Sequence, residues 1–174
     1  MQMLRREGGK SLTGKTHIMG GIAATAAFAQ TSNYDPAIMI AAGALGGMIP
    51  DICHGGSKIG RKLPWLSKFI NRIFGHRTLT HSILFLIIIN GLLLLIIPFE
   101  SIRIGILIGM ASHLLLDAAT KNGIKLLYPL DITFRLPLTM KTGGALESIV
   151  LTGLTLVVLY YGKDILLYYL YQYK

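Results

Sequence analysis

The sequence predicts an all-α integral membrane protein, and two observations support this assignment. Hydrophobic residues make up 52% of the 174 residues, and the mean hydropathy is +0.57, which is more apolar than an ordinary soluble domain. The apolar residues also gather into long runs with few charges, which are typical of membrane-spanning helices. Because the chain is short, we expect a single membrane-embedded domain over residues 1–174.

Five apolar stretches predict about five transmembrane helices. They cover residues 18–29, 37–49, 83–98, 102–116 and 149–161. The first two are shorter than the ~20 residues that cross a bilayer core. They are rich in alanine and glycine, however, and small residues let two helices approach closely. We therefore expect the first two stretches to form a tight hairpin.

The basic residues predict the orientation of these helices. Fourteen of the 17 lysines and arginines lie within residues 1–16, 51–81 and 118–146, whereas the connections at 30–36 and 99–101 hold none. All three basic segments fall on one side if every stretch spans, and the positive-inside rule makes that side cytoplasmic. The N-terminus is then cytoplasmic. The net charge of +9 follows from this topology and from anionic lipid, so no nucleic acid is expected as a partner.

Residues 57–74 predict a helix of a different kind. Trp65, Phe69 and Ile73 recur at helical spacing, while the basic residues fall away from that face. This pattern is typical of a helix that lies in the membrane surface. We predict a cytoplasmic interfacial helix here, with a packed cytoplasmic helix as the alternative.

A nucleotide-binding motif near the N-terminus fails on its context. Gly9, Gly14, Lys15 and Thr16 satisfy the pattern G-x-x-x-x-G-K-[ST]. A working P-loop follows a buried strand and opens a helix whose N-terminus holds phosphate. Only a short charged segment precedes Gly9, and an Ala/Gly-rich stretch follows the motif. We therefore predict no nucleotide binding; the residue of interest in this segment is His17.

The histidines and two aspartates gather at the predicted cytoplasmic ends of the helices. His113 and Asp117 are four residues apart, so both lie on one face of a helix. Ionisable residues at membrane depth are costly and usually functional, and imidazole with carboxylate suits Zn²⁺, or alternatively Mn²⁺ or Fe. The pair predicts a metal clamp, with a structural hydrogen bond as the alternative.

A recurring pattern supplies a second His/Asp pair. His17 and His81 each follow a threonine that is expected to cap a helix, and each helix returns through another that ends in an aspartate, Asp51 or Asp117. The separations are 34 and 36 residues. We interpret this as a parallel internal repeat about an axis along the membrane normal, with chance recurrence of a common dipeptide as the alternative.

These residues together predict a site for one or two divalent ions. The candidate ligands are His17, Asp51, His54, His76, His81, His113 and Asp117. A carboxylate shared by two ions would hold them ~3.5–4 Å apart. Cys53 is either a soft ligand or a small buried residue.

The candidate catalytic residues are Glu147, Arg77 and Asp51. Glu147 is expected to act as a ligand or as a base on water. Arg77 is expected to hold a phosphoryl oxygen, with a plain lipid headgroup contact as the alternative.

Two long segments carry a family resemblance. They read MIPDICHGGSKIGRKLPWLSKFINRIFGHRTLTHS and GMASHLLLDAATKNGIKLLYPLDITFRLPL. Both resemble the signatures of the YdjM-like family, LexA-regulated inner-membrane proteins described as metal-dependent hydrolases. The resemblance implies a multi-pass protein of the bacterial cytoplasmic (inner) membrane. It also implies a site made of His17, Asp51, His76, His81, His113 and Asp117, with Glu147 as a further candidate. Cys53 stands where the family usually carries a second aspartate, which bears on one ligand and on metal preference.

The sequence as a whole predicts a membrane-bound metal-dependent hydrolase with a cytoplasm-facing, dinuclear His/Asp site. The predicted interfacial helix and basic loops favour membrane lipid as a partner and a phosphoester of a lipid or lipid-linked substrate, as in a phospholipase or phosphoesterase. A divalent-metal transporter would need its ligands near the bilayer midplane, whereas these gather at one end. A non-catalytic scaffold stabilised by a closed metal site remains as the alternative.

Overall fold

The computed structural model describes residues 12–75, 77–137, 140 and 142–172. These residues form α-helices, two short 3₁₀ helices and two isolated β-bridges, with no strand among them. The helices are α1 (Gly14–Ala29), α2 (Pro36–Gly46), η1 (Ile49–Cys53), α3 (Lys58–Lys62), α4 (Pro64–Phe74), η2 (Leu79–His81), α5 (Ile83–Ile96), α6 (Glu100–Ala118) and α7 (Ala145–Gln172). The predicted all-α class is confirmed.

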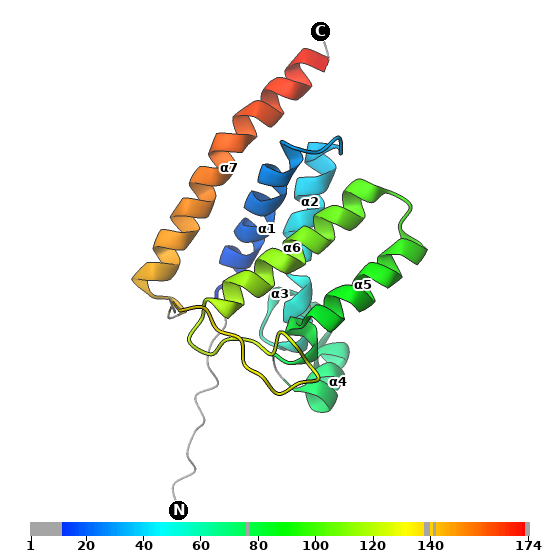
Figure 1. Ribbon diagram of the computed structural model, residues 1–174, viewed down its shortest axis with the longest axis vertical. Helices are drawn as coiled ribbons and strands as arrows, with labels where there is room; N and C mark the ends of the chain where they lie inside the picture. Colours follow the sequence, from blue (N-terminus) through cyan, green and yellow to red (C-terminus); the bar gives the residue numbers. More distant parts are fainter. Residues whose placement is uncertain (1–11, 76, 138–139, 141, 173–174) are drawn as a thin grey trace, which may run out of the picture.

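The centre of the fold is a bundle of α1, α2 and α6, which lie side by side in Figure 1. Glycines set their spacing. A Cβ added at Gly21 on α1, or at Gly109 on α6, would lie 2.2 Å from the carbonyl oxygen of Gly43 on α2. Only a residue without a side chain permits so close an approach between helix backbones. The tight hairpin expected from the small residues of the first two stretches is therefore present, and α6 packs against it.

The helix α5 packs more loosely on the outside of α6. It begins where the Ser82 hydroxyl accepts a hydrogen bond from the Phe85 N–H and ends at Ile96, two residues before Pro98. A proline disfavours helical geometry in the residue before it. None of the residues of α5 is fully buried, and its outer leucines and isoleucines are exposed. This apolar surface is suited to contact with lipid.

Three helical stretches among the described residues are long and apolar enough to cross a membrane. They are Pro36–Cys53, Glu100–Ala118 and Ala145–Tyr171. The expectation of five spans is not confirmed, because α1 has 16 residues and α5 has 14. At ~1.5 Å per residue, α5 is about 21 Å long, against a hydrocarbon core of ~30 Å.

The predicted internal repeat is not confirmed either. His17 lies inside α1, whereas His81 lies in η2, before α5 begins. The α1–α2 hairpin is closed by glycine contacts, but α5 presents branched side chains to α6. The two hairpins therefore differ in both backbone and packing.

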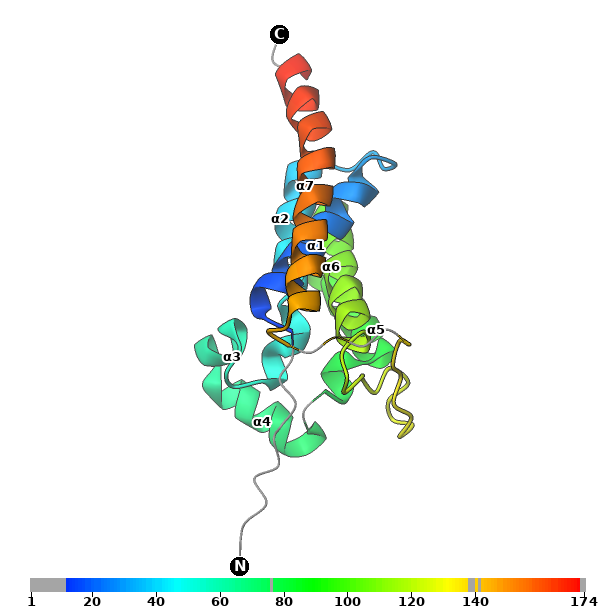
Figure 2. The same cartoon turned by 90° about the vertical axis from the view of Figure 1, so that its left-hand side faces the viewer.

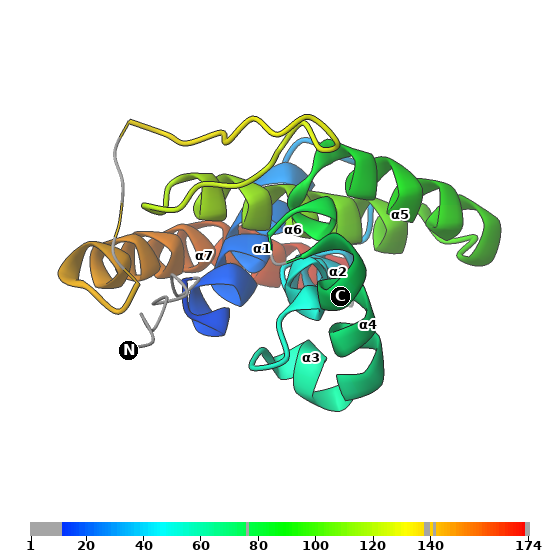
Figure 3. The same cartoon turned by 90° about the horizontal axis from the view of Figure 1, so that it is seen from below.

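The helices α3 and α4 lie beyond the end of the bundle at which α1 begins and α6 ends, and they project to one side of it (Figures 2 and 3). The sequence predicts one helix over this region, but Pro64 divides it because proline has no N–H to continue the ladder. Trp65, Phe69 and Ile73 are exposed on α4, as an interfacial helix requires.

Candidate metal centre

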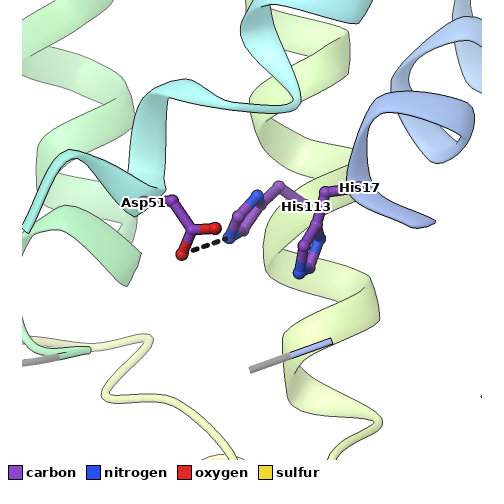
Figure 4. A group of neighbouring side chains, drawn as sticks. All are labelled: His17, Asp51 and His113. Carbon is purple, nitrogen blue, oxygen red and sulfur yellow. Dashed lines mark ion pairs between the residues drawn. The ribbon is translucent and has the colours of Figure 1, made fainter. Parts of the chain in front are cut away.

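Five buried side chains from four elements meet at one end of the bundle. They are His17 on α1, Asp51 in η1, His81 in η2, and His113 and Asp117 on α6. Two overlapping groups have ligand atoms within 4.8 Å of one another: His17, Asp51 and His113, and His81, His113 and Asp117. His113 belongs to both groups. Figure 4 shows the first group, with an ion pair between Asp51 and His113.

The ring of His113 is oriented by the backbone of the neighbouring hairpin. Its Nδ1 lies 2.7 Å from the carbonyl oxygen of Gly47, which can only accept, so Nδ1–H donates and Nε2 is the ring nitrogen that faces the cluster. That Nε2 lies 3.3 Å from Nε2 of His81 and 3.5 Å from Oδ2 of Asp117. A histidine whose other ring nitrogen is held in this way is typical of a metal ligand.

The ring of His81 is held by a hydroxyl, which can donate or accept, rather than by a carbonyl. Its Nδ1 lies 3.0 Å from the hydroxyl of Thr80, and its Nε2 lies 3.0 Å from Oδ2 of Asp117. The second contact of Nε2 is Oδ1 of Asp51, at 3.9 Å. The Nε2 atoms of both histidines therefore point to the same two carboxylates.

His17 is the member of the cluster that most needs a partner. Its ring stacks on that of His113, with centroids 3.7 Å apart and planes at 17°. Both of its ring nitrogens are buried without a hydrogen bond, as is Oδ1 of Asp51, and Nε2 of His17 lies 3.5 Å from Oδ1 of Asp117. Buried polar atoms of this kind are costly. A nitrogen and oxygen donor set fits Zn²⁺, Mn²⁺ or Fe, so the residues present fit a bound metal.

Arg77 holds the inner carboxylate rather than facing a ligand. Its Nη2 donates to Oδ1 of Asp117 at 2.7 Å, and its Nη1 to the hydroxyl of Thr120 at 3.2 Å. The guanidinium is buried, and its backbone adopts a positive φ of 60°, which is uncommon outside glycine. Arg77 thus orients Asp117, leaving Oδ2 toward His81 and His113.

Without a metal, the proton balance of the cluster favours a charged His81. Burial alone would lower the pKa of His81, but its hydrogen bond to Asp117 and a contact with Cys53 raise that pKa to about 9. The protonated imidazole then pairs with the carboxylate of Asp117. A metal bound by His81 would require this proton to leave.

A cavity of about 740 Å³ opens onto the cluster. His17 and Asp51 are buried but form part of its wall, so the cavity borders one side of the cluster. Lys15, Lys58 and Arg61 also line it. The nitrogen and oxygen donor set therefore lies beside a cavity with a positively charged lining.

Glu147 lies in a different contact from the one expected for a base. Its Oε1 accepts hydrogen bonds from the N–H of Thr13 and the hydroxyl of Thr16, both at 2.7 Å, and its Oε2 accepts one from the N–H of Gly143 at 2.6 Å. The carboxylate thus occupies the positive N-terminus of α1 and fastens α7 to it. It is in neither ligand group.

This contact occupies the helix N-terminus on which a P-loop would depend. Gly14, Lys15 and Thr16 form the first turn of α1, and Gly9 lies outside the described residues. The helix N-terminus that a P-loop offers to phosphate here receives the carboxylate of Glu147.

Of the remaining candidates, His54 and Cys53 belong to neither ligand group, although Cys53 contacts His81. His54 is exposed and lines the cavity, but it belongs to neither ligand group. Cys53 is fully buried, with its Sγ 3.7 Å from the carbonyl oxygen of Pro50, and it is also in neither group. His76 lies outside the described residues.

The sequence reasoning missed two groups that orient the histidines. The carbonyl of Gly47 holds His113, and no sequence signal identifies a backbone acceptor. The hydroxyl of Thr80 holds His81; the threonine beside the histidine was the available signal, but it is expected there as a helix cap. In the structure, Ser82 caps α5 instead.

Comparison with known proteins identifies the family. The model of the YdjM inner membrane protein family matches residues 12–172. The protein YvsG of Bacillus subtilis (strain 168) is 58% identical over 150 residues, which cover 86% of this chain and 94% of that protein. The inner membrane protein YdjM of Escherichia coli (strain K12) is 32% identical over 157 residues, 82% of this chain and 79% of that protein. No solved structure matches the chain. The chain belongs to the YdjM family of inner membrane proteins.

Proposed function

We propose that this protein is a membrane-bound metal-dependent hydrolase that cleaves a phosphoester of a lipid or lipid-linked substrate. Its His/Asp centre faces the cytoplasm and holds one or two divalent ions, with Zn²⁺ as the first candidate and Mn²⁺ or Fe as alternatives. The orientation follows from the basic residues of the segments at the end of the bundle where the cluster lies.

One observation carries this proposal. Three polar atoms without a hydrogen bond, on His17 and Asp51, lie buried beside the Nε2 atoms of His81 and His113, which Thr80 and Gly47 orient. A purely structural network would satisfy its own polar atoms. A donor set that is oriented but unsatisfied supports a metal as the missing partner.

The two ligand groups suggest which residues hold the metal and which face the substrate. His113 is shared, and Asp117, held by Arg77, offers Oδ2 to His81 and His113. His17 and Asp51 form the side that meets the cavity, where a substrate arrives. A bound divalent ion supplies Lewis acidity and makes water a usable nucleophile near neutral pH.

Asp51 is the best-placed proton acceptor for that water. It lines the cavity, and its Oδ1 lacks a hydrogen bond. Glu147 is less suited, because three donors already occupy its oxygens. Arg77 acts through Asp117 and positions it, rather than holding a phosphoryl oxygen.

The first test is metal content per chain, measured by plasma mass spectrometry on detergent-purified protein. We expect metal in the wild type and a sharp loss in both His113→Ala and Asp117→Ala. His54→Ala is the matched control, because His54 lines the same cavity but lies outside both ligand groups. Absence of metal in the wild type, even after zinc or manganese is added, would contradict the proposal.

The second test separates an enzyme from a metal-stabilised scaffold. Metal-loaded wild-type protein is incubated with phospholipids and phosphomonoesters, and released phosphate and headgroups are measured. Hydrolysis that is lost in Asp51→Asn and in His113→Ala supports the hydrolase. A protein that holds its metal and hydrolyses nothing in this panel would favour the scaffold.

A further inference from the structure

The cavity beside the metal centre has the size of a small-ligand site. Its volume of about 740 Å³ lies within the ~300–1,000 Å³ of ordinary ligand pockets. It is far larger than a hydrolytic water requires. One wall is the side of the metal centre formed by His17 and Asp51, and the N-terminal turn of α1 and the helix α3 form others.

The charge of the lining selects an anion. Lys15 from α1 and Lys58 and Arg61 from α3 line the cavity. Among the described residues that line it, Asp51 is the one acidic residue, and Asp51 belongs to the metal centre. Lysine and arginine bind phosphate through charge-assisted hydrogen bonds, and the planar guanidinium of Arg61 can bind two oxygens at once.

The helix α4 connects this cavity to a membrane surface. Asn71 of α4 lines the cavity. On the same helix Trp65, Phe69 and Ile73 are 70%, 58% and 55% exposed, and basic residues flank them. An amphipathic helix with large exposed apolar residues and a basic face is suited to the interface of an anionic bilayer. A ligand that reaches the cavity past α4 therefore comes most directly from the lipid headgroup layer.

We infer that the cavity binds the phosphate of an anionic membrane lipid headgroup through Lys15, Lys58 and Arg61. This inference rests on the proposed function only for the fate of the ligand, because binding requires no hydrolysis. The substrate then comes from the membrane in which the protein lies, and not from the aqueous phase.

The test is isothermal titration of the detergent-solubilised full chain with defined probes. The probes are dioctanoyl phosphatidylglycerol, dioctanoyl phosphatidylcholine and inorganic phosphate, and a chelator is present to prevent hydrolysis. We expect the anionic lipid to bind more tightly than both other probes. The double variant Lys58→Gln/Arg61→Gln should weaken its binding about tenfold or more, as expected when charge-assisted hydrogen bonds are removed.

The control is a second double variant with the same loss of charge. Lys121→Gln/Arg135→Gln removes one lysine and one arginine charge, as Lys58→Gln/Arg61→Gln does, at exposed residues that do not line the cavity. It should bind the anionic lipid nearly as tightly as the wild type. Equal weakening by both double variants would overturn the assignment to the cavity, since only the overall charge would then matter.

The other outcomes are equally decisive. Inorganic phosphate binding as tightly as the lipid would overturn the membrane as the source. Phosphatidylcholine binding as tightly would overturn selection by charge, and no binding of any probe would overturn the site. Metal content is measured on the same preparations before the chelator is added, so a missing metal centre and a cavity that fails to bind lipid give separate results.

Trp65 provides an independent check on the membrane source. It is the single tryptophan of the chain, so its fluorescence reports on α4 alone. In lipid nanodiscs we expect quenching by lipids brominated high on the acyl chain, and little quenching by aqueous iodide. Efficient iodide quenching without quenching by brominated lipid would overturn the role given to α4.

Discussion

The helices α2 and α5 both pack against α6, and they do so by opposite means. The contact with α2 is built on glycines, with Gly109 of α6 against the carbonyl of Gly43. The contact with α5 is built on bulky side chains such as Phe85 and Leu86, which pack against the core cluster that contains Met110 without being fully buried themselves. One neighbour of α6 is therefore held by backbone proximity and the other by looser side-chain contacts.

The difference teaches how the metal centre is held together. On the α2 side, the close backbones bring the Gly47 carbonyl to His113, so the scaffold itself orients a ligand. On the α5 side, polar side chains orient the ligands instead, since Arg77 holds Asp117 and Thr80 holds His81. Substitutions on the two sides should accordingly fail in different ways.

The largest effect is expected on the α5 side, at the buried ion pair. Arg77→Ala leaves Asp117 charged and buried, and loss of one partner of such a pair costs about 3–5 kcal/mol. The measurement is the free energy of unfolding in detergent, followed by circular dichroism. Lys125→Ala is the control, because the pair of Lys125 with Asp131 is exposed and such pairs contribute about 0–1 kcal/mol. Similar losses in the two variants would contradict a special role for Arg77.

A smaller effect is expected on the α2 side, at the glycine contact. In Gly109→Ala the new Cβ would lie 2.2 Å from the Gly43 carbonyl oxygen, so the helices must separate; overpacking of this kind typically costs about 1–3 kcal/mol. Gly91→Ala on α5 meets no atom within 4 Å and should be neutral or stabilising by up to about 1 kcal/mol. Melting temperatures of both variants in detergent test the contrast, which fails if the two shift together.

Metal affinity distinguishes the two ways of orienting a histidine. Thr80→Val removes the hydroxyl beside Nδ1 of His81 and should weaken metal binding about 10–100-fold, as for other groups that support a ligand. The fold should survive, since the shape of the side chain is retained. Competition with a metal chelator of known affinity measures the change. The control is Thr155→Val on α7, where the hydroxyl donates to the carbonyl of Leu151; it should leave the metal affinity unchanged. If Thr80→Val binds metal as tightly as the wild type, the Thr80 hydroxyl does not support His81 as a ligand.

The smallest effect concerns protons. The pKa of His81 is raised from 6.5 to about 9, so at about pH 7.5 the metal-free protein carries a proton there that the metal must displace. Zinc binding should release about one proton from this residue at that pH, and progressively fewer as the pH rises past 9. Calorimetry in buffers of different ionisation enthalpy counts these protons. If His81→Gln releases the same number of protons on binding zinc, the proton belongs to another group.

Local sequence patterns predicted the His113/Asp117 pair and the glycine-rich hairpin. They did not predict the long-range contacts of Arg77 and Glu147 or the lengths of α1 and α5. His113 and Asp117 share a helix face because the helical period places residues four apart together, and the glycine-rich hairpin follows from composition. The partners of Arg77 and Glu147 lie 40 and 131 residues away, and no periodicity identifies contacts at that range. The lengths of α1 and α5 depend on where their ends are capped, which hydropathy alone does not locate.

The contact of Glu147 with α1 has a consequence for the order in which the protein is made. Synthesis begins at the N-terminus, so α1 and α2 reach the membrane with His17 and Asp51 before α6 brings the histidine and aspartate that surround them. Glu147 follows later still, and only then can its carboxylate bond Thr13 and Thr16. Among the described helices, α7 is therefore synthesised last, and the N-terminus of α1 lacks this carboxylate until the rest of the centre has been synthesised.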